Sequence, residues 1–234
     1  LLGVVLLFLN SNLNNAVITL MNVIIILVPL IGTIFGIMYY YNSREFTELL
    51  LAQPIKRSSI FLGQYLGVAI SLSLSLVLGL GIPFLAYGLL ESAIIWDFFS
   101  LLTTGVFLTF IFSALAFNIA LSTENRIKGF SYAILLWLFL AVVYDGIFLL
   151  ALVYFQEYPL DKFSLVATMF NPIDLSRILI LLKLDIAALL GYTGAVFKQF
   201  FGTGLGFLLA MGSLLIWVLL PVWRMLSVAK KKDF

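Results

Sequence analysis

The sequence contains no histidine and no cysteine. Their absence removes the usual zinc and copper ligands, the thiol and imidazole nucleophiles, and the side chain that titrates nearest neutral pH. Charged residues are also scarce, at 10% of the 234 residues, where a soluble domain has about 25%. The formal net charge of +2 is too small to indicate a nucleic-acid partner. We therefore expect a multi-span membrane protein in contact with lipid, without a metal site of its own.

Long apolar runs are what the sequence has instead, and about 20 residues suffice to cross a bilayer. Five runs reach that length, at residues 16–41, 59–87, 99–121, 130–155 and 203–223. A short run at 1–9 opens the sequence without Met, and we expect it to be the remnant of a truncated first span. The predicted fold is an all-α membrane bundle of six helices, forming one transmembrane domain over residues 1–234.

Lysine and arginine are distributed unevenly among the breaks between these runs. Nine of them lie in the break at 42–58, in the break before residue 130, and in the C-terminal tail, whereas four lie in the segment 156–202. Because basic residues are enriched in cytoplasmic loops, we predict that the loop 42–58 and the C-terminus face the cytoplasm. The segment 156–202 then lies outside.

The inner loop reads NSREFTELLLAQPIKRS. Ser43 can cap a short helix, with an apolar side formed by Phe46 and residues 49–51, and Pro54 would end it. One interpretation is an ordinary polar loop whose charges snorkel. The other is an amphipathic helix that lies along the membrane and is presented to a cytosolic partner.

The outer segment is half polar although it lies between two apolar spans. Asn171 can cap a helix with Pro172 in its first turn, and Asp174 can pair with Arg177 three residues later. Asp185 can cap a second short helix. Helices this short cannot cross a bilayer, so we expect interfacial or re-entrant helices that form a lid or a docking surface for a partner.

Two polar residues, Asn118 and Asp145, fall inside predicted spans. A charge at the bilayer centre costs about 2.5–3.5 kcal/mol on insertion scales, so Asp145 should be paired or face a wet cavity. We favour pairing, with Asn118 or with a helix of a second copy, over a place on a transport path. Asn118 itself is typical of a hydrogen bond between helices.

The inner loop resembles the loop between the second and third spans of type-2 ABC transporter permeases. Glu48, Leu49 and Leu50 match its Glu-Leu-Leu, Pro54 and Arg57 match its proline and basic residue, and Phe46–Thr47 stand where it has Gly-Thr. In that family this loop is the coupling helix that docks on a cytosolic ATP-binding subunit. The resemblance implies this role for Glu45, Phe46, Thr47, Glu48, Leu49, Pro54, Lys56 and Arg57. ATP and Mg would bind that subunit, since this chain lacks the G-x-x-x-x-G-K-[ST] motif and is not expected to be an enzyme.

The outer segment is more specifically similar to the permeases of nitrous oxide reductase maturation. The shared residues are Asn171, Pro172, Asp174, Arg177, Leu184, Asp185, Ala187, Ala188, Leu189, and 191–195, which include Tyr192. The resemblance implies one half of a homodimeric permease, with a periplasmic maturation protein bound outside. The assembly would supply a sulfur or copper species, or mechanical work, for the copper–sulfide centre. A generic exporter of lipid or drug is the alternative. An intramembrane enzyme is disfavoured by the missing histidine, and a passive anchor would not need the coupling loop.

Overall fold

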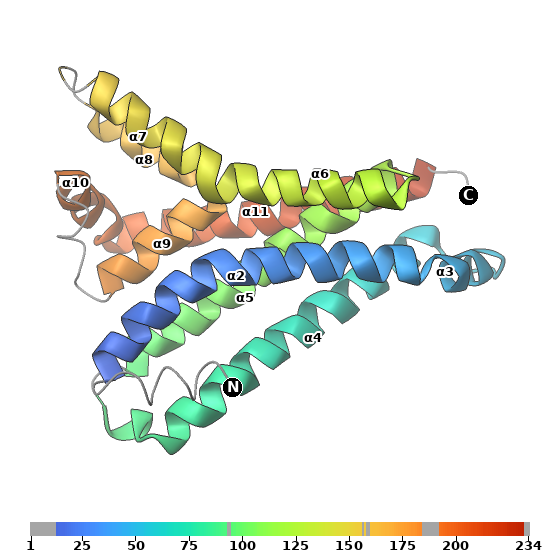
Figure 1. Cartoon of the computed structure of the whole chain (residues 1–234), viewed down its shortest axis with the longest axis horizontal. Helices are drawn as coiled ribbons and strands as arrows, with labels where there is room; N and C mark the ends of the chain where they lie inside the picture. Colours follow the sequence, from blue (N-terminus) through green and yellow to red (C-terminus); the bar gives the residue numbers. More distant parts are fainter. Residues whose placement is uncertain (1–12, 93–94, 156, 158–159, 184–191, 232–234) are drawn as a thin grey trace.

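The structure is a computed structural model that describes residues 13–92, 95–155, 157, 160–183 and 192–231 (Figure 1). Every regular element in these ranges is a helix. This confirms the predicted all-α class of membrane protein. The expected span remnant at 1–9 and the expected helix cap at Asp185 lie outside the described residues.

Five helical segments of the described chain are long and apolar enough to cross a membrane. They are α2 (Leu13–Asn42), α4 (Arg57–Ala86), α5 (Ile95–Ser122), the continuous run α6 (Arg126–Leu138), η2 (Phe139–Val143) and α7 (Tyr144–Tyr154), and α11 (Gly204–Lys231). Each covers one of the apolar runs in the sequence. The shorter elements are α3 (Arg44–Leu51), η1 (Leu89–Glu91), α8 (Asp161–Met169), α9 (Pro172–Lys183) and α10 (Tyr192–Phe201).

Helix α5 lies at the centre of the bundle and packs against α2, α4, α6, α9 and α11. Its closest neighbour is α2, and glycine makes this approach possible. A Cβ added at Gly36 would lie 2.9 Å from the Cβ of Ala116, and one at Gly32 would lie 3.5 Å from the Cβ of Phe112. The first G-x-x-x-G pair of the sequence therefore serves packing within the chain. The second pair differs, because Gly63 and Gly67 have open space around them.

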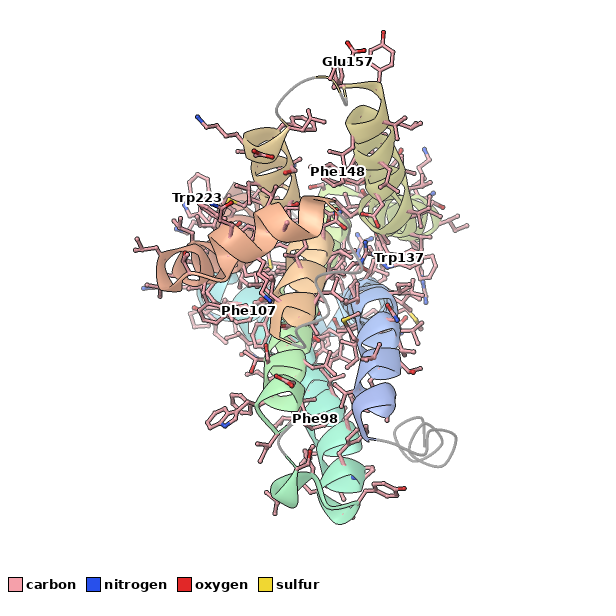
Figure 2. The ribbon with its side chains drawn as sticks, turned by 90° about the vertical axis from the view of Figure 1, so that its left-hand side faces the viewer. Phe98, Phe107, Trp137, Phe148, Glu157 and Trp223 are labelled. Atoms are coloured by element: carbon pink, nitrogen blue, oxygen red, sulfur yellow. The ribbon has the colours of Figure 1, made fainter. Side chains whose placement is uncertain are left out.

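A π-helical turn, η2, separates α6 from α7, and the run bends at this junction (Figure 1). Such turns interrupt the regular hydrogen-bond ladder and are a recognised cause of helix kinks. Beyond the bend, α7 packs beside α8. Phe148 lies between these two helices (Figure 2), and its ring stacks on that of Phe163 with 6.4 Å between centroids.

The two ends of the bundle differ in composition and in structure (Figure 1). Helix α3, the α5–α6 junction and the C-terminal end of α11 gather at one end, called the α3 end below. Helices α8, α9 and α10 lie toward the opposite end. The sequence predicted the helix that begins after Asn171, which is α9, but it did not predict α8. Helices α8 and α9 form an elbow with a bend of 114°. The stretch from Tyr192, expected to lead directly into the last span, forms the separate helix α10.

Candidate functional site

Helix α3 presents its apolar side chains to the surroundings. Phe46 is 59% exposed and Leu49 is 68% exposed, although both are large and hydrophobic. All the residues that the coupling-loop resemblance singled out are exposed, except Thr47. Large apolar side chains among charged ones are typical of a surface that binds another protein.

Thr47 instead fixes α3 to the bundle. Its side chain is buried, and its hydroxyl accepts a hydrogen bond of 2.6 Å from Gln64 Nε2 on α4. The same hydroxyl donates to the carbonyl of Ser43 at 2.8 Å. A buried hydrogen bond between two side chains therefore joins the short helix to a spanning helix.

One local expectation for this loop, the cap at Ser43, is corrected by the structure. Ser43 stands at the N-cap position of α3, but its side chain makes no capping bond there. Its hydroxyl donates backwards, to the carbonyl of Tyr39 at 2.8 Å, and so extends the end of α2. Arg44 and Glu48 form an ion pair of 3.0 Å on the outer face of α3, with side chains 54% and 50% exposed. A pair so open to solvent contributes little stability.

A charged cluster lies at the other end, between α7 and α9. Nη1 of Arg177 lies 2.6 Å from Oδ2 of Asp145 and 3.4 Å from Oδ1 of Asp174. Asp145 and Arg177 are 27% and 29% exposed, and the side chain of Asp174 is 8% exposed. Within the chain the partner of Asp145 is thus Arg177 and not Asn118, whereas pairing with a second copy stays a prediction. The pair satisfies a charge that would otherwise be costly inside a span.

Asn171 joins this cluster to the bend in the α6–α7 run. Its Oδ1 accepts from the backbone N–H of Ile173 at 3.1 Å, which caps the start of α9. Its Nδ2 donates to Oδ2 of Asp174 at 2.9 Å and to the carbonyl of Leu140 at 2.8 Å. Leu140 belongs to the π-turn η2. One buried amide therefore links the outer helix to the point where the span bends.

Asp174 belongs to α9, which with α8 forms a bent pair of apolar helices that could be one further, broken span or a re-entrant loop. Its carboxyl group and that of Asp145 share one guanidinium, that of Arg177.

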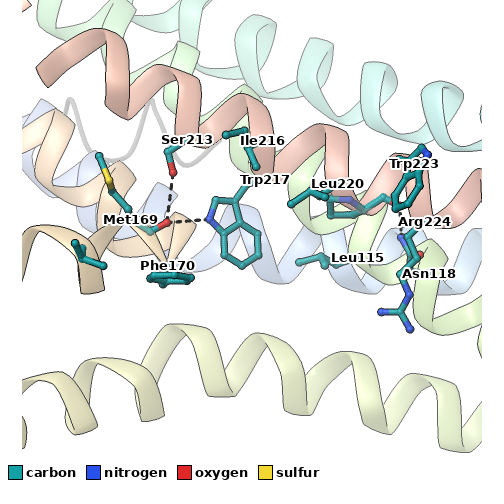
Figure 3. Close-up of a pocket in the computed structure, with 12 residues that line it drawn as sticks. Leu115, Asn118, Met169, Phe170, Ser213, Ile216, Trp217, Leu220, Trp223 and Arg224 are labelled. Carbon is teal, nitrogen blue, oxygen red and sulfur yellow. Dashed lines mark hydrogen bonds between the residues drawn. The ribbon is translucent and has the colours of Figure 1, made fainter. Parts of the chain in front are cut away.

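The elbow between α8 and α9 is fixed from both sides. Tyr144 on α7 donates its hydroxyl to the carbonyl of Ala167 at 2.6 Å. From α11, Trp217 donates its indole N–H to the carbonyl of Met169 at 3.1 Å, and Ser213 donates to the same oxygen at 3.4 Å (Figure 3). The outer helices are thus anchored to two spans and cannot move without disturbing both.

The sequence of the chain resembles those of known proteins at a low level of identity. No model of a protein family matches the chain. Two curated proteins match it, both named "Probable ABC transporter permease protein NosY". The one from Pseudomonas aeruginosa is 29% identical over 145 residues, which are 60% of this chain and 53% of the relative. The one from Stutzerimonas stutzeri is 27% identical over 187 residues, which are 75% of this chain and 62% of the relative. The chain is thus similar, at a distant level, to two proteins named as ABC transporter permeases.

The matches thus cover between about half and three-fifths of the length of these relatives. Both relatives are named as ABC transporter permeases, and the apolar spanning helices of this chain are consistent with that likeness.

Sequence reasoning missed three features of the region around α7, α8 and α9. These are helix α8, the π-turn, and the pairing of Asp145 with Arg177. The acidic Asp161 in the first turn of α8 was a usable helix signal.

Other predicted residues lie where the sequence placed them. The amide of Asn118 makes the expected hydrogen bond between helices, because its Nδ2 donates to the carbonyl of Pro221 on α11 at 2.6 Å. Tyr192 begins α10, and Pro172 begins α9. Among the described residues, no group of three or more acidic residues could hold a metal ion.

Proposed function

We propose that this permease acts in maturation of the copper–sulfide centre of nitrous oxide reductase. ATP hydrolysis by a separate cytosolic subunit, which binds ATP and Mg, drives the movement of a sulfur or copper species or mechanical work on a periplasmic partner. Support comes from the two relatives named NosY and from the residues of the outer segment that resemble this group.

The exposed apolar face of α3 is the observation that carries the coupling role. Phe46 and Leu49 project from a helix held rigidly by the Thr47–Gln64 hydrogen bond. A cleft in the ATP-binding subunit would cover these side chains and remove them from water. Each ATP-driven movement of that subunit then displaces α3, and through it α4.

The orientation and partners follow from the charges. The basic residues of the α3 end support a cytoplasmic location for this end and for the C-terminus, in a protein of the bacterial inner membrane. A periplasmic maturation protein docks on the outer helices, for which Asn171, Pro172, Asp174, Arg177, Asp185 and Tyr192 are the proposed determinants. A second copy completes a homodimeric permease.

A generic exporter of lipid, drug or another small molecule is the alternative. An apolar pocket of about 690 Å³ between α5, α8 and α11 favours this reading, because its lining suits an apolar cargo better than a metal or sulfide ion.

Deleting the gene in its source cells separates these possibilities. If the proposal holds, nitrous oxide reductase from the deletion strain loses the optical signature and the copper content of the copper–sulfide centre but keeps its electron-transfer copper. The wild-type gene restores the centre. L49D does not restore it, because a carboxylate on the exposed face of α3 prevents docking. The matched control L90D, at a 69% exposed leucine in η1, restores it. Intact centres in the deletion strain would contradict the proposal.

A further inference from the structure

The pocket between α5, α8 and α11 is apolar along most of its length and polar at one end (Figure 3). Met169 and Phe170 line it near the elbow, and Trp217 lines its middle. Asn118 and Arg224 lie together at the other end. That end belongs to the α3 end of the bundle, since Asn118 is in the last turns of α5 and Arg224 is in the last turns of α11.

Asn118 has an unused acceptor. Its side chain is buried, with 7% exposure, and its Nδ2 donates to the carbonyls of Ala114 and Pro221. Its Oδ1 has no hydrogen-bond partner among the described residues. A buried carbonyl oxygen without a partner is rare, because it has lost its water without gaining a donor. Because this oxygen has less than 1 Å² of accessible surface, a ligand in the pocket cannot contact it, and the groups open to a ligand at this end are the Arg224 side chain and the apolar lining.

Arg224 supplies a positive charge beside this acceptor. Its side chain is exposed, and no carboxylate of the described residues forms an ion pair with it. Guanidinium groups bind phosphate through parallel hydrogen bonds. The adjacent Trp223 is 69% exposed, and tryptophan is enriched at the headgroup level of membranes. The polar end of the pocket therefore combines the features of a headgroup site.

The length of the pocket matches one leaflet. Arg224 and Ser213, which lines the pocket at the level of Met169, are eleven residues apart on α11. At about 1.5 Å per residue this is roughly 16 Å, or about half of a hydrocarbon layer of about 30 Å. An acyl chain that starts beside Arg224 would thus end near Phe170.

We propose that this pocket binds an anionic phospholipid, taken from the leaflet at the α3 end. The headgroup phosphate lies on Arg224, and one acyl chain lies along Trp217. The proposal goes beyond the maturation role and does not depend on it.

Native mass spectrometry of the purified permease tests this site with two lipids. Phosphatidylglycerol carries a net negative charge on its phosphate, whereas phosphatidylcholine is zwitterionic. We expect the wild type to retain phosphatidylglycerol at least ten-fold more strongly. R224Q should lose most of this preference. K230Q, which removes a charge from the same exposed end of α11 but outside the pocket, should keep it.

Three results would overturn the proposal. One is equal retention of the two lipids by the wild type. Another is an equal loss of preference in R224Q and K230Q, which would indicate general attraction to the basic end. The third concerns a second copy in the pocket: a photoactivatable group on a cysteine placed at Ile216 would then cross-link two chains, and added phosphatidylglycerol would not prevent it. Because the side chain of Arg224 is exposed, R224Q should keep the thermal unfolding temperature of the wild type in phosphatidylcholine.

Discussion

Replacing Arg177 with glutamine removes the cation that faces two carboxyl groups between α7 and α9. Breaking a fully buried ion pair costs about 3–5 kcal/mol, whereas an exposed pair is worth about 0–1 kcal/mol. Arg177 and Asp145 are 29% and 27% exposed, so the loss should lie between these limits. We expect R177Q to lower the free energy of unfolding by about 1–3 kcal/mol.

Thermal unfolding of the purified protein, followed by tryptophan fluorescence at one scan rate, measures this loss. For a chain of this size the expected decrease in Tm is roughly 2–12 °C. The matched control is R44Q, which breaks an exposed pair on α3 with side chains about half exposed, and it should lower Tm by less than about 2 °C. D145N should cost less than R177Q, because Arg177 keeps its contact with Asp174.

Two results would refute this reasoning. If R177Q is no less stable than R44Q, the cluster contributes nothing beyond a surface ion pair. If D145N is less stable than R177Q, the stabilising contact of Asp145 is not the one with Arg177.

Two further predictions concern other contacts. Replacing Gln64 with leucine removes the hydrogen bond that holds α3 to α4, so trypsin should cleave within α3 faster, while Gln53→Leu on the exposed loop leaves the rate unchanged. Gly36→Leu should lower stability by about 1–3 kcal/mol by forcing α2 from α5, whereas Gly67→Leu enters open space and should have little effect on the same melting curve.

The spanning helices could be predicted because length and hydropathy decide them. A run of about 20 apolar residues forms a helix in a membrane whatever its neighbours are, since its backbone has no other partner for its hydrogen bonds. Length and hydropathy do not predict where a spanning helix bends. Residues 139–143 contain neither proline nor glycine, yet they form a π-turn whose Leu140 carbonyl accepts from Asn171. That contact joins residues 31 positions apart, and nothing local indicates it.

The short outer helices were harder to predict for a related reason. Helices of about ten residues are marginal alone and depend on tertiary packing. The cap at Asn171 could be predicted because a local residue pattern produces it. Helix α8 depends instead on contacts such as Tyr144 with Ala167, which the sequence does not reveal. At Ser43 the local pattern predicted a contact that the structure does not have. The residue is suited to cap α3, but it makes its hydrogen bond to the preceding helix.

The central claim is that α3 docks on an ATP-binding subunit, and site-specific cross-linking tests it most directly. The chain has no cysteine, so one introduced at Leu49 is unique in it. A photoactivatable group on that cysteine should form an adduct in source cells whose second component, identified by mass spectrometry, carries the G-x-x-x-x-G-K-[ST] motif of an ATPase. A cysteine at Tyr154, which is 84% exposed at the opposite end, should give no such adduct. If Leu49 yields no ATPase adduct, or if both positions yield it equally, α3 is not the coupling helix.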